Sequence, residues 1–114
     1  MKKYKYISQR KNKYYRFELI PPNNNEQPIG VSSLYNTYEE CEKARRYFSG
    51  FVKTHKLNSE KTNYVEIYSD DLGRYYFGFI DSAGNIIFYR EKGYWDKTEC
   101  KRGIDRVYRA FFNL

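Results

Sequence analysis

Residues 64–89 read YVEIYSDDLGRYYFGFIDSAGNIIFY, a stretch in which apolar side chains alternate with others and turn residues interrupt the alternation twice. Alternation with a period of two predicts β-strands, and clusters of Asp, Gly, Ser and Asn predict the turns between them. We therefore expect three antiparallel strands joined by two short turns, at 64–68, 75–80 and 86–89.

A helix is expected directly after these strands. Asp96 with Glu99 three residues later has the spacing of a capping box, which marks the start of a helix. Apolar residues then recur from Cys100 to Phe111 at the i, i+3, i+4 and i+7 positions that form one face of a helix. The second half of the chain therefore predicts a β-β-β-α unit.

The first half shows the same order. Four apolar or aromatic residues lie 60 positions before a similar residue in the second half: Ile7, Tyr15, Phe17 and Leu19. Beyond the loop 21–28 the offset becomes 59, which relates Ile29 to Phe88, Tyr35 to Tyr94, Glu40 to Glu99 and Cys41 to Cys100. Thr37 with Glu40 forms a second capping box. We interpret the pattern as a tandem duplication of residues 1–57 and 58–114.

The expected fold is of the α+β class. A unit of 57 residues buries little apolar surface by itself, so we expect the two units to share one core as one compact body. The prediction is a single antiparallel sheet with two helices packed on one face and a pseudo-twofold axis between the units.

The second unit resembles the repeat of the YegP-like family, a domain of unknown function in bacteria and archaea. The residues that carry the resemblance are 64–68, 73–77, 81–87 and 93–94, ahead of the helix at 100–107. The resemblance covers nearly the whole chain, closely in the second half and loosely in the first.

The resemblance implies a single antiparallel sheet, formed by tandem copies or by dimers of one copy. It also implies a further strand after each helix, exchanged between units, although residues 111–114 leave no room for one after the second helix. It implies no activity, cofactor or catalytic residue.

Composition indicates a folded chain without membrane spans. Aromatic residues make up 20% of the sequence, more than disordered chains contain. No run approaches the ~20 apolar residues that a membrane helix needs, and no apolar stretch follows the basic N-terminus as in a signal peptide. With two cysteines and no secretion signal, we expect a cytoplasmic protein with reduced thiols.

Positive charge is concentrated near the N-terminus. Residues 1–57 hold 12 basic and 5 acidic residues, whereas residues 58–114 hold 9 of each. Basic and aromatic side chains are interleaved across the first predicted hairpin: Lys3, Tyr4, Lys5, Tyr6, Lys11, Lys13, Tyr14 and Arg16. Cations beside flat rings are typical of surfaces that bind single-stranded nucleic acid or another polyanion. The alternatives are a protein contact, or an edge hairpin whose lysines deter pairing with other strands.

The remaining chemically reactive residues have structural interpretations. Cys41 and Cys100 lie on the apolar faces of the predicted helices, which favours core packing over a metal or redox site. His55 falls at the expected end of the first helix, and Asp70, Asp71 and Asp81 fall in turns. We expect no catalytic, cofactor or metal site.

Tyrosines are expected to cover the helix-free face of the sheet: Tyr4, Tyr6, Tyr14, Tyr64, Tyr68 and Tyr76. Such a face suits either a binding surface or a homodimer interface. The expected function is thus a non-enzymatic binding or interaction module. The alternative is polyanion binding by the N-terminal hairpin.

Overall fold

The computed structural model describes residues 3–22, 27–57 and 64–112, and its element order is the expected one. The elements are β1 (Lys5–Lys11), β2 (Tyr14–Ile20), β3 (Gly30–Val31), α1 (Tyr38–Leu57), β4 (Val65–Ser69), β5 (Tyr75–Ile80), β6 (Ile86–Tyr89) and α2 (Lys97–Phe112). The expected α+β class is confirmed.

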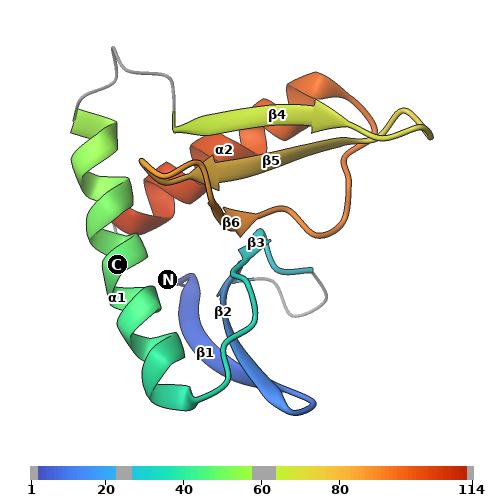
Figure 1. Ribbon diagram of the computed structural model, residues 1–114. Coiled ribbons are helices and arrows are strands. Elements are labelled where there is room, and N and C mark those ends of the chain that lie inside the picture. The colour runs from blue at the N-terminus through green and yellow to red at the C-terminus, as the bar shows by residue number, and fades with distance from the viewer. Residues whose placement is uncertain (1–2, 23–26, 58–63, 113–114) are drawn as a thin grey trace.

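All six strands form one antiparallel sheet, in the order β1-β2-β3-β6-β5-β4. The halves meet at the centre, where Val31 of β3 pairs with Tyr89 of β6. In Figure 1 the β1–β2 hairpin lies at the bottom, β4 and β5 lie at the top, and α1 runs past both groups of strands. The outer strands β1 and β4 are the edges of the sheet.

One hydrophobic core joins the halves, on the face of the sheet that the helices cover. Phe48 of α1 lies at its centre, with ring centroids 4.4 Å from Phe88, 5.4 Å from Phe79 and 5.9 Å from Phe17. Val107 of α2 is fully buried in the same cluster. Because side chains alternate between the faces of a strand, residues next to these core positions point to the helix-free face.

Both predicted helix starts are confirmed. The backbone amide of Glu40 donates to Oγ1 of Thr37 over 3.1 Å, and the amide of Glu99 donates to Oδ1 of Asp96 over 2.8 Å. Each bond satisfies an amide that the first turn of a helix leaves without a partner. Neither α1 nor α2, the helices of the described residues, is long and apolar enough to cross a bilayer.

The strand register corrects one predicted match. Ile67 lies opposite Phe77, and the residue opposite the corresponding Phe17 is Ser8, not Ile7. Ile7 points to the helix-free face and is 40% exposed. Matching Ile7 with Ile67 was wrong because the offset between β1 and β4 is 59 residues, whereas it is 60 between β2 and β5.

Turn length explains the change of offset. Lys11 pairs with Tyr14, so two residues connect β1 and β2, and Asn12 takes a φ of 58° there. The turn between β4 and β5 is closed by a hydrogen bond from the Asp70 amide to the Arg74 carbonyl, which leaves three residues between them. Because the second turn is one residue longer, β4 is displaced by one position relative to β1 when β2 and β5 are aligned.

Candidate functional site

The tyrosines of the N-terminal hairpin divide between the two faces of the sheet. Tyr4 and Tyr6 pack against the core, and the Tyr6 hydroxyl donates a hydrogen bond to the Arg45 carbonyl on α1. Tyr64 also packs against the core. Placing these three on the helix-free face was wrong: Tyr6 lies opposite the core residue Leu19 and shares its face, and the Tyr64 ring contacts Phe51 and His55 of α1.

The lysines of the hairpin and Tyr14 remain at the surface: Lys3, Lys5, Lys11, Lys13 and Tyr14 are exposed. Arg16, by contrast, is only 9% exposed. Its Nε lies 2.8 Å from Oε2 of Glu18, and its Nη1 lies 2.7 Å from Oε2 of Glu91, just beyond β6. Arg16 is therefore held by two carboxylates and links the halves across the sheet.

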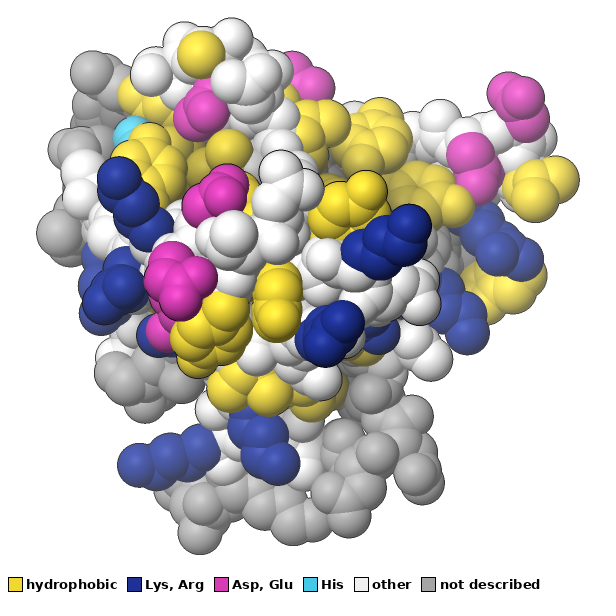
Figure 2. All heavy atoms as spheres, turned by 60° about the horizontal axis from the view of Figure 1, so that its bottom comes forward, with side chains coloured by type: hydrophobic (Ala, Val, Ile, Leu, Met, Phe, Trp, Pro, Cys, Tyr) yellow, Lys and Arg dark blue, Asp and Glu magenta, His cyan; other side chains and the backbone are white. Residues whose placement is uncertain are grey.

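Glu18 is almost fully buried on the helix-free face, at 3% exposure. Besides Arg16, it accepts a hydrogen bond of 2.9 Å from Nε2 of Gln9 and lies 3.9 Å from Nζ of Lys11. This charged cluster neutralises part of the positive charge that the sequence concentrates in the hairpin. On the face seen in Figure 2, basic side chains lie in separate groups, with hydrophobic and acidic side chains between them.

The second half presents aromatic rings on its helix-free face. The rings of Tyr68 and Tyr76 stack, with centroids 5.7 Å apart and planes at 14°. Tyr76 also covers Gly93, where a Cβ would come within 2.7 Å of its Cζ. A side chain at Gly93 would displace the ring, so the glycine keeps Tyr76 flat against the backbone.

Asp70 fixes the outer end of this stack. Its carboxylate accepts hydrogen bonds from the Tyr76 hydroxyl at 2.7 Å and from the amides of Arg74 and Leu72 at 2.9 and 3.0 Å. These bonds, that of the Arg74 amide first, lower the pKa of Asp70. Asp70 is thus a turn residue, as expected, that also orients an aromatic ring.

Trp95 extends the aromatic surface beyond the strands. Its side chain is 79% exposed, and the Arg74 guanidinium lies 4.9 Å from its ring centroid, in the range of a cation–π contact. We define the aromatic face by its members: Tyr68, Arg74, Tyr76, Ile86, Tyr89 and Trp95. The sequence predicted only two of these, although a lone tryptophan just before a helix start was a visible signal.

The cysteines occupy core positions, as expected. Cys41 and Cys100 are both fully buried and unpaired. Burial raises the pKa of the Cys100 thiol to about 11 and also raises that of Cys41, whose Sγ lies 3.3 Å from Oγ of Ser8. Both thiols therefore stay protonated at neutral pH.

The other reactive residues also serve local structure. His55 lies in the last turns of α1, with Nδ1 2.8 Å from the Phe51 carbonyl and its ring centroid 3.7 Å from that of Tyr64. Asp81 accepts bonds from the amides of Ala83 and Asn85 in its turn. Among residues 3–22, 27–57 and 64–112, no group of three His, Cys, Asp or Glu side chains could hold a metal ion.

The surface has several shallow hollows, including one beside the N-terminal hairpin and one beside Trp95. The first lies between β1 and α1, has a volume of about 340 Å³ and is lined by Tyr6, Arg45, Arg46, Ser49 and Lys53. The second, about 580 Å³, lies beside Trp95 and mixes basic residues with Asp96 and Glu99. We call the first the β1–α1 hollow.

Comparison with known proteins places the chain beside proteins of unknown function. Residues 70–110, about a third of the chain, match the family model described as a domain of unknown function, DUF1508. A comparison with curated protein sequences finds no match.

Two solved structures share the fold. The protein of unknown function yegP from E. coli has a TM-score of 0.73 and 20% identity, over 97% of this chain and 88% of that one. A UPF0339 protein from Shewanella oneidensis has a TM-score of 0.66 and 19% identity, over 96% of this chain and 83% of that one. The expected resemblance to the YegP-like family is confirmed.

Proposed function

We propose that this YegP-like chain is a non-enzymatic binding module that contacts a protein partner through the aromatic face. The observation that carries the proposal is the rigid set of rings on a helix-free sheet surface. Trp, Tyr and Arg are the residue types that most often dominate protein interfaces, and all three occur here within one contiguous set.

The fixed orientation of two rings supports a role of the aromatic face in binding. Tyr76 is held by Asp70 and by the close approach of Gly93, and Tyr68 stacks on Tyr76. Rings that are already fixed lose little conformational entropy when a partner binds. Tyr68 nevertheless remains 40% exposed and the neighbouring Ile86 is 44% exposed, so this surface still offers contact area.

We further propose that residues 1–57 and 58–114 are duplicated units. What supports this is a shared set of backbone bonds: Tyr15 is bridged to Tyr35 by a pair of hydrogen bonds, as Tyr75 is to Tyr94. The helix starts are also capped in the same way 59 residues apart. In the proposed duplication, only the second unit has acquired the aromatic face.

A comparison of three baits tests the binding function. We expect wild-type protein to retain a partner from extract of its own cells, and the double variant Tyr68→Ser/Trp95→Ala to lose it. Tyr47→Ser is the matched control, because Tyr47 is 57% exposed on α1 and lies outside the aromatic face. Quantitative mass spectrometry of the retained proteins measures the difference, and the same proteins on all three baits would refute the proposal.

A second copy of this chain is the other binding partner to test. Light scattering across a range of concentrations distinguishes the cases: if the partner is a second copy, wild type should form dimers and Tyr68→Ser/Trp95→Ala should remain monomeric. A wild-type monomer with an extract partner favours a different protein.

Polyanion binding by the N-terminal hairpin is the second candidate function. Four exposed lysines and Tyr14 favour it, whereas Arg16 is held by Glu18 and Glu91. Titration of labelled single-stranded RNA and DNA at two salt concentrations tests it, because phosphate contacts weaken as salt rises. Binding that is absent at low salt, or indifferent to salt, would exclude this function.

A further inference from the structure

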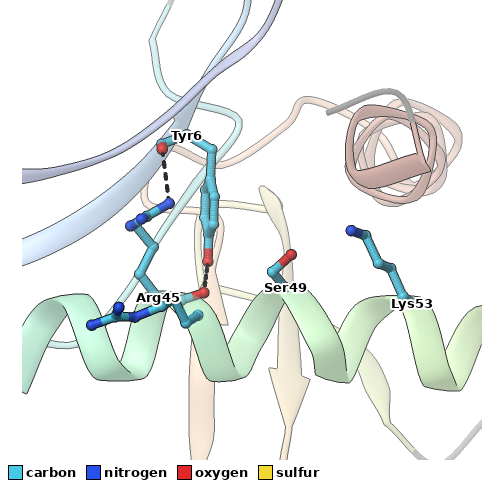
Figure 3. Close-up of a pocket in the computed structure, with 5 residues that line it drawn as sticks. Tyr6, Arg45, Ser49 and Lys53 are labelled. Carbon is cyan, nitrogen blue, oxygen red and sulfur yellow. Dashed lines mark hydrogen bonds between the residues drawn. The ribbon is translucent and has the colours of Figure 1, made fainter.

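The β1–α1 hollow is a cationic site outside the aromatic face. Arg45, Arg46, Ser49 and Lys53 line it from α1, and the Tyr6 ring lines it from β1. In Figure 3 Tyr6 reaches across from its strand to the Arg45 carbonyl, while Ser49 and Lys53 rise from the helix on the same side. The lining thus combines three cationic side chains with the Ser49 hydroxyl and the Tyr6 ring.

Positive charge in the hollow is only partly neutralised. The Glu42 carboxylate pairs with Arg45, with Oε2 2.7 Å from Nε and Oε1 3.1 Å from Nη2, so the charge of Arg45 is already balanced. Arg46 donates from Nε to the Glu42 carbonyl at 3.3 Å and forms no ion pair among the described residues, although its charge helps to lower the pKa of the nearby Glu42 carboxylate. Within that part of the chain, Lys53 likewise forms no ion pair. Arg46 and Lys53 therefore line the hollow without an ion pair, and none of its described lining residues carries a carboxylate.

The second half shows that the fold does not need these cations. Tyr6 and Val65 correspond because they lie opposite Leu19 and Phe79, at equivalent places in the sheet. The residues 59 positions after the helix lining are Ile104, Asp105, Tyr108 and Phe112 in place of Arg45, Arg46, Ser49 and Lys53. Val65, Ile104 and Tyr108 pack against the core. Ile104 and Tyr108 are thus packed against the core, whereas Arg45 and Ser49 at the corresponding positions line an open hollow.

The geometry points to a binding site for a phosphate group in the β1–α1 hollow, with Arg46 and Lys53 supplying the charge and Ser49 a hydroxyl donor. Charge-assisted hydrogen bonds from such side chains are the strong contacts that phosphate oxygens make in proteins. Tyr6 provides a fixed wall, and its burial raises the pKa of the phenol, so the wall adds no negative charge. The phosphate is either free inorganic phosphate or a monoester carried by a small organic molecule.

Titration of ¹⁵N-labelled protein followed by ¹H–¹⁵N correlation spectra tests the site. The probes are inorganic phosphate and a nucleoside monophosphate, each at two salt concentrations. We expect saturable shifts at the amides of Tyr6, Ser49 and Lys53. Tighter binding of the monoester identifies an organic phosphate as the ligand, and equal binding identifies the free anion.

Two double variants distinguish phosphate binding at this site from general electrostatic attraction to a basic protein. Arg46→Gln/Lys53→Gln should weaken binding roughly 100-fold, at about tenfold for each charge-assisted contact. Lys43→Gln/Lys101→Gln removes the same charge from exposed positions outside both the hollow and the N-terminal hairpin, and should bind like wild type. Equal weakening in both variants, or shifts spread over all lysine-rich segments, would overturn the proposal.

Discussion

The helix positions that line the β1–α1 hollow carry different chemistry in the two halves. In the first half Ser49 and Lys53 leave an open, basic hollow beside Tyr6, whereas Tyr108 and Phe112 occupy the corresponding positions in the second. Core positions on the same helices are alike, since Cys41 and Cys100 are both fully buried. The difference teaches that the shared positions serve folding and that the unshared ones are available for binding.

The helix-free faces differ in the same manner. Arg16 and Glu18 form a buried charged cluster on β2, and the residues 60 positions later on β5 are Tyr76 and Gly78. Gly78 leaves room over the backbone, where Tyr68 and Ile86 approach it. One half therefore uses its outer face to tie the sheet together, and the other presents rings to solvent.

The largest expected difference in stability lies in the core, at the corresponding helix positions Phe48 and Val107. Phe48→Ala should lower the free energy of unfolding by about 3–5 kcal/mol, because the ring contacts strands of both halves and leaves a cavity. Val107→Ala removes fewer buried atoms and should cost about 2 kcal/mol. Urea denaturation measures both. Equal losses would show that α1 holds the halves together no more than α2 does.

The charged cluster should give the next largest effect. Arg16→Met leaves the buried Glu18 with Gln9 and Lys11 as its remaining partners among the described residues, and should cost about 3 kcal/mol of stability at pH 7. Arg16→Met/Glu18→Leu removes both charges and should recover most of that loss. A double variant as unstable as the single one would mean that the pair itself, rather than the abandoned charge, stabilises the sheet.

The same cluster predicts a dependence on pH. Hydrogen bonds from Arg16 hold the pKa of Glu91 below its ordinary value. A depressed folded-state pKa stabilises the fold at neutral pH, and this contribution disappears as the pH falls through the lowered pKa. Stability of Arg16→Met/Glu18→Leu, which frees Glu91 without leaving Glu18 unpaired, should therefore vary less with acid pH than that of wild type, as urea denaturation between pH 7 and pH 3 would show. An unchanged profile would contradict this role of the pair.

The smallest effect concerns a helix position that is Ala44 in one half and Gly103 in the other. Ala44→Gly should cost about 1 kcal/mol through helix propensity alone. Gly103→Ala places a Cβ 2.8 Å from Cζ of Tyr94, and this crowding should outweigh the propensity gain and cost about 1–2 kcal/mol. Thermal unfolding compares the two. Stabilisation by Gly103→Ala would show that the Tyr94 ring moves aside freely.

Local patterns predicted most of the fold. Thr37 and Asp96 cap their helices as expected, because a cap depends on residues within one turn. Sequence reasoning failed at Ile7 and Tyr6, whose faces depend on the register between β1 and β2. A one-residue difference in turn length decides that register, and nothing within β1 itself records it.

The candidate sites were less predictable than the fold. Positive charge in the first half was visible in the sequence, but pairing with Glu18 and Glu91 removed Arg16 from the expected surface. Arg46 and Lys53, on α1, joined Tyr6 only because the helix packs beside the edge strand. Such groupings depend on contacts between residues that are distant along the chain.

The sequence by itself determined the strands, the helices, their caps and the buried cysteines, since each follows from periodicity or from neighbours along the chain. Only the tertiary structure decided which tyrosines face solvent, which cations form ion pairs and where hollows open at the surface. Those properties depend on register and on packing between elements, and a shift of one residue in a strand exchanges its faces.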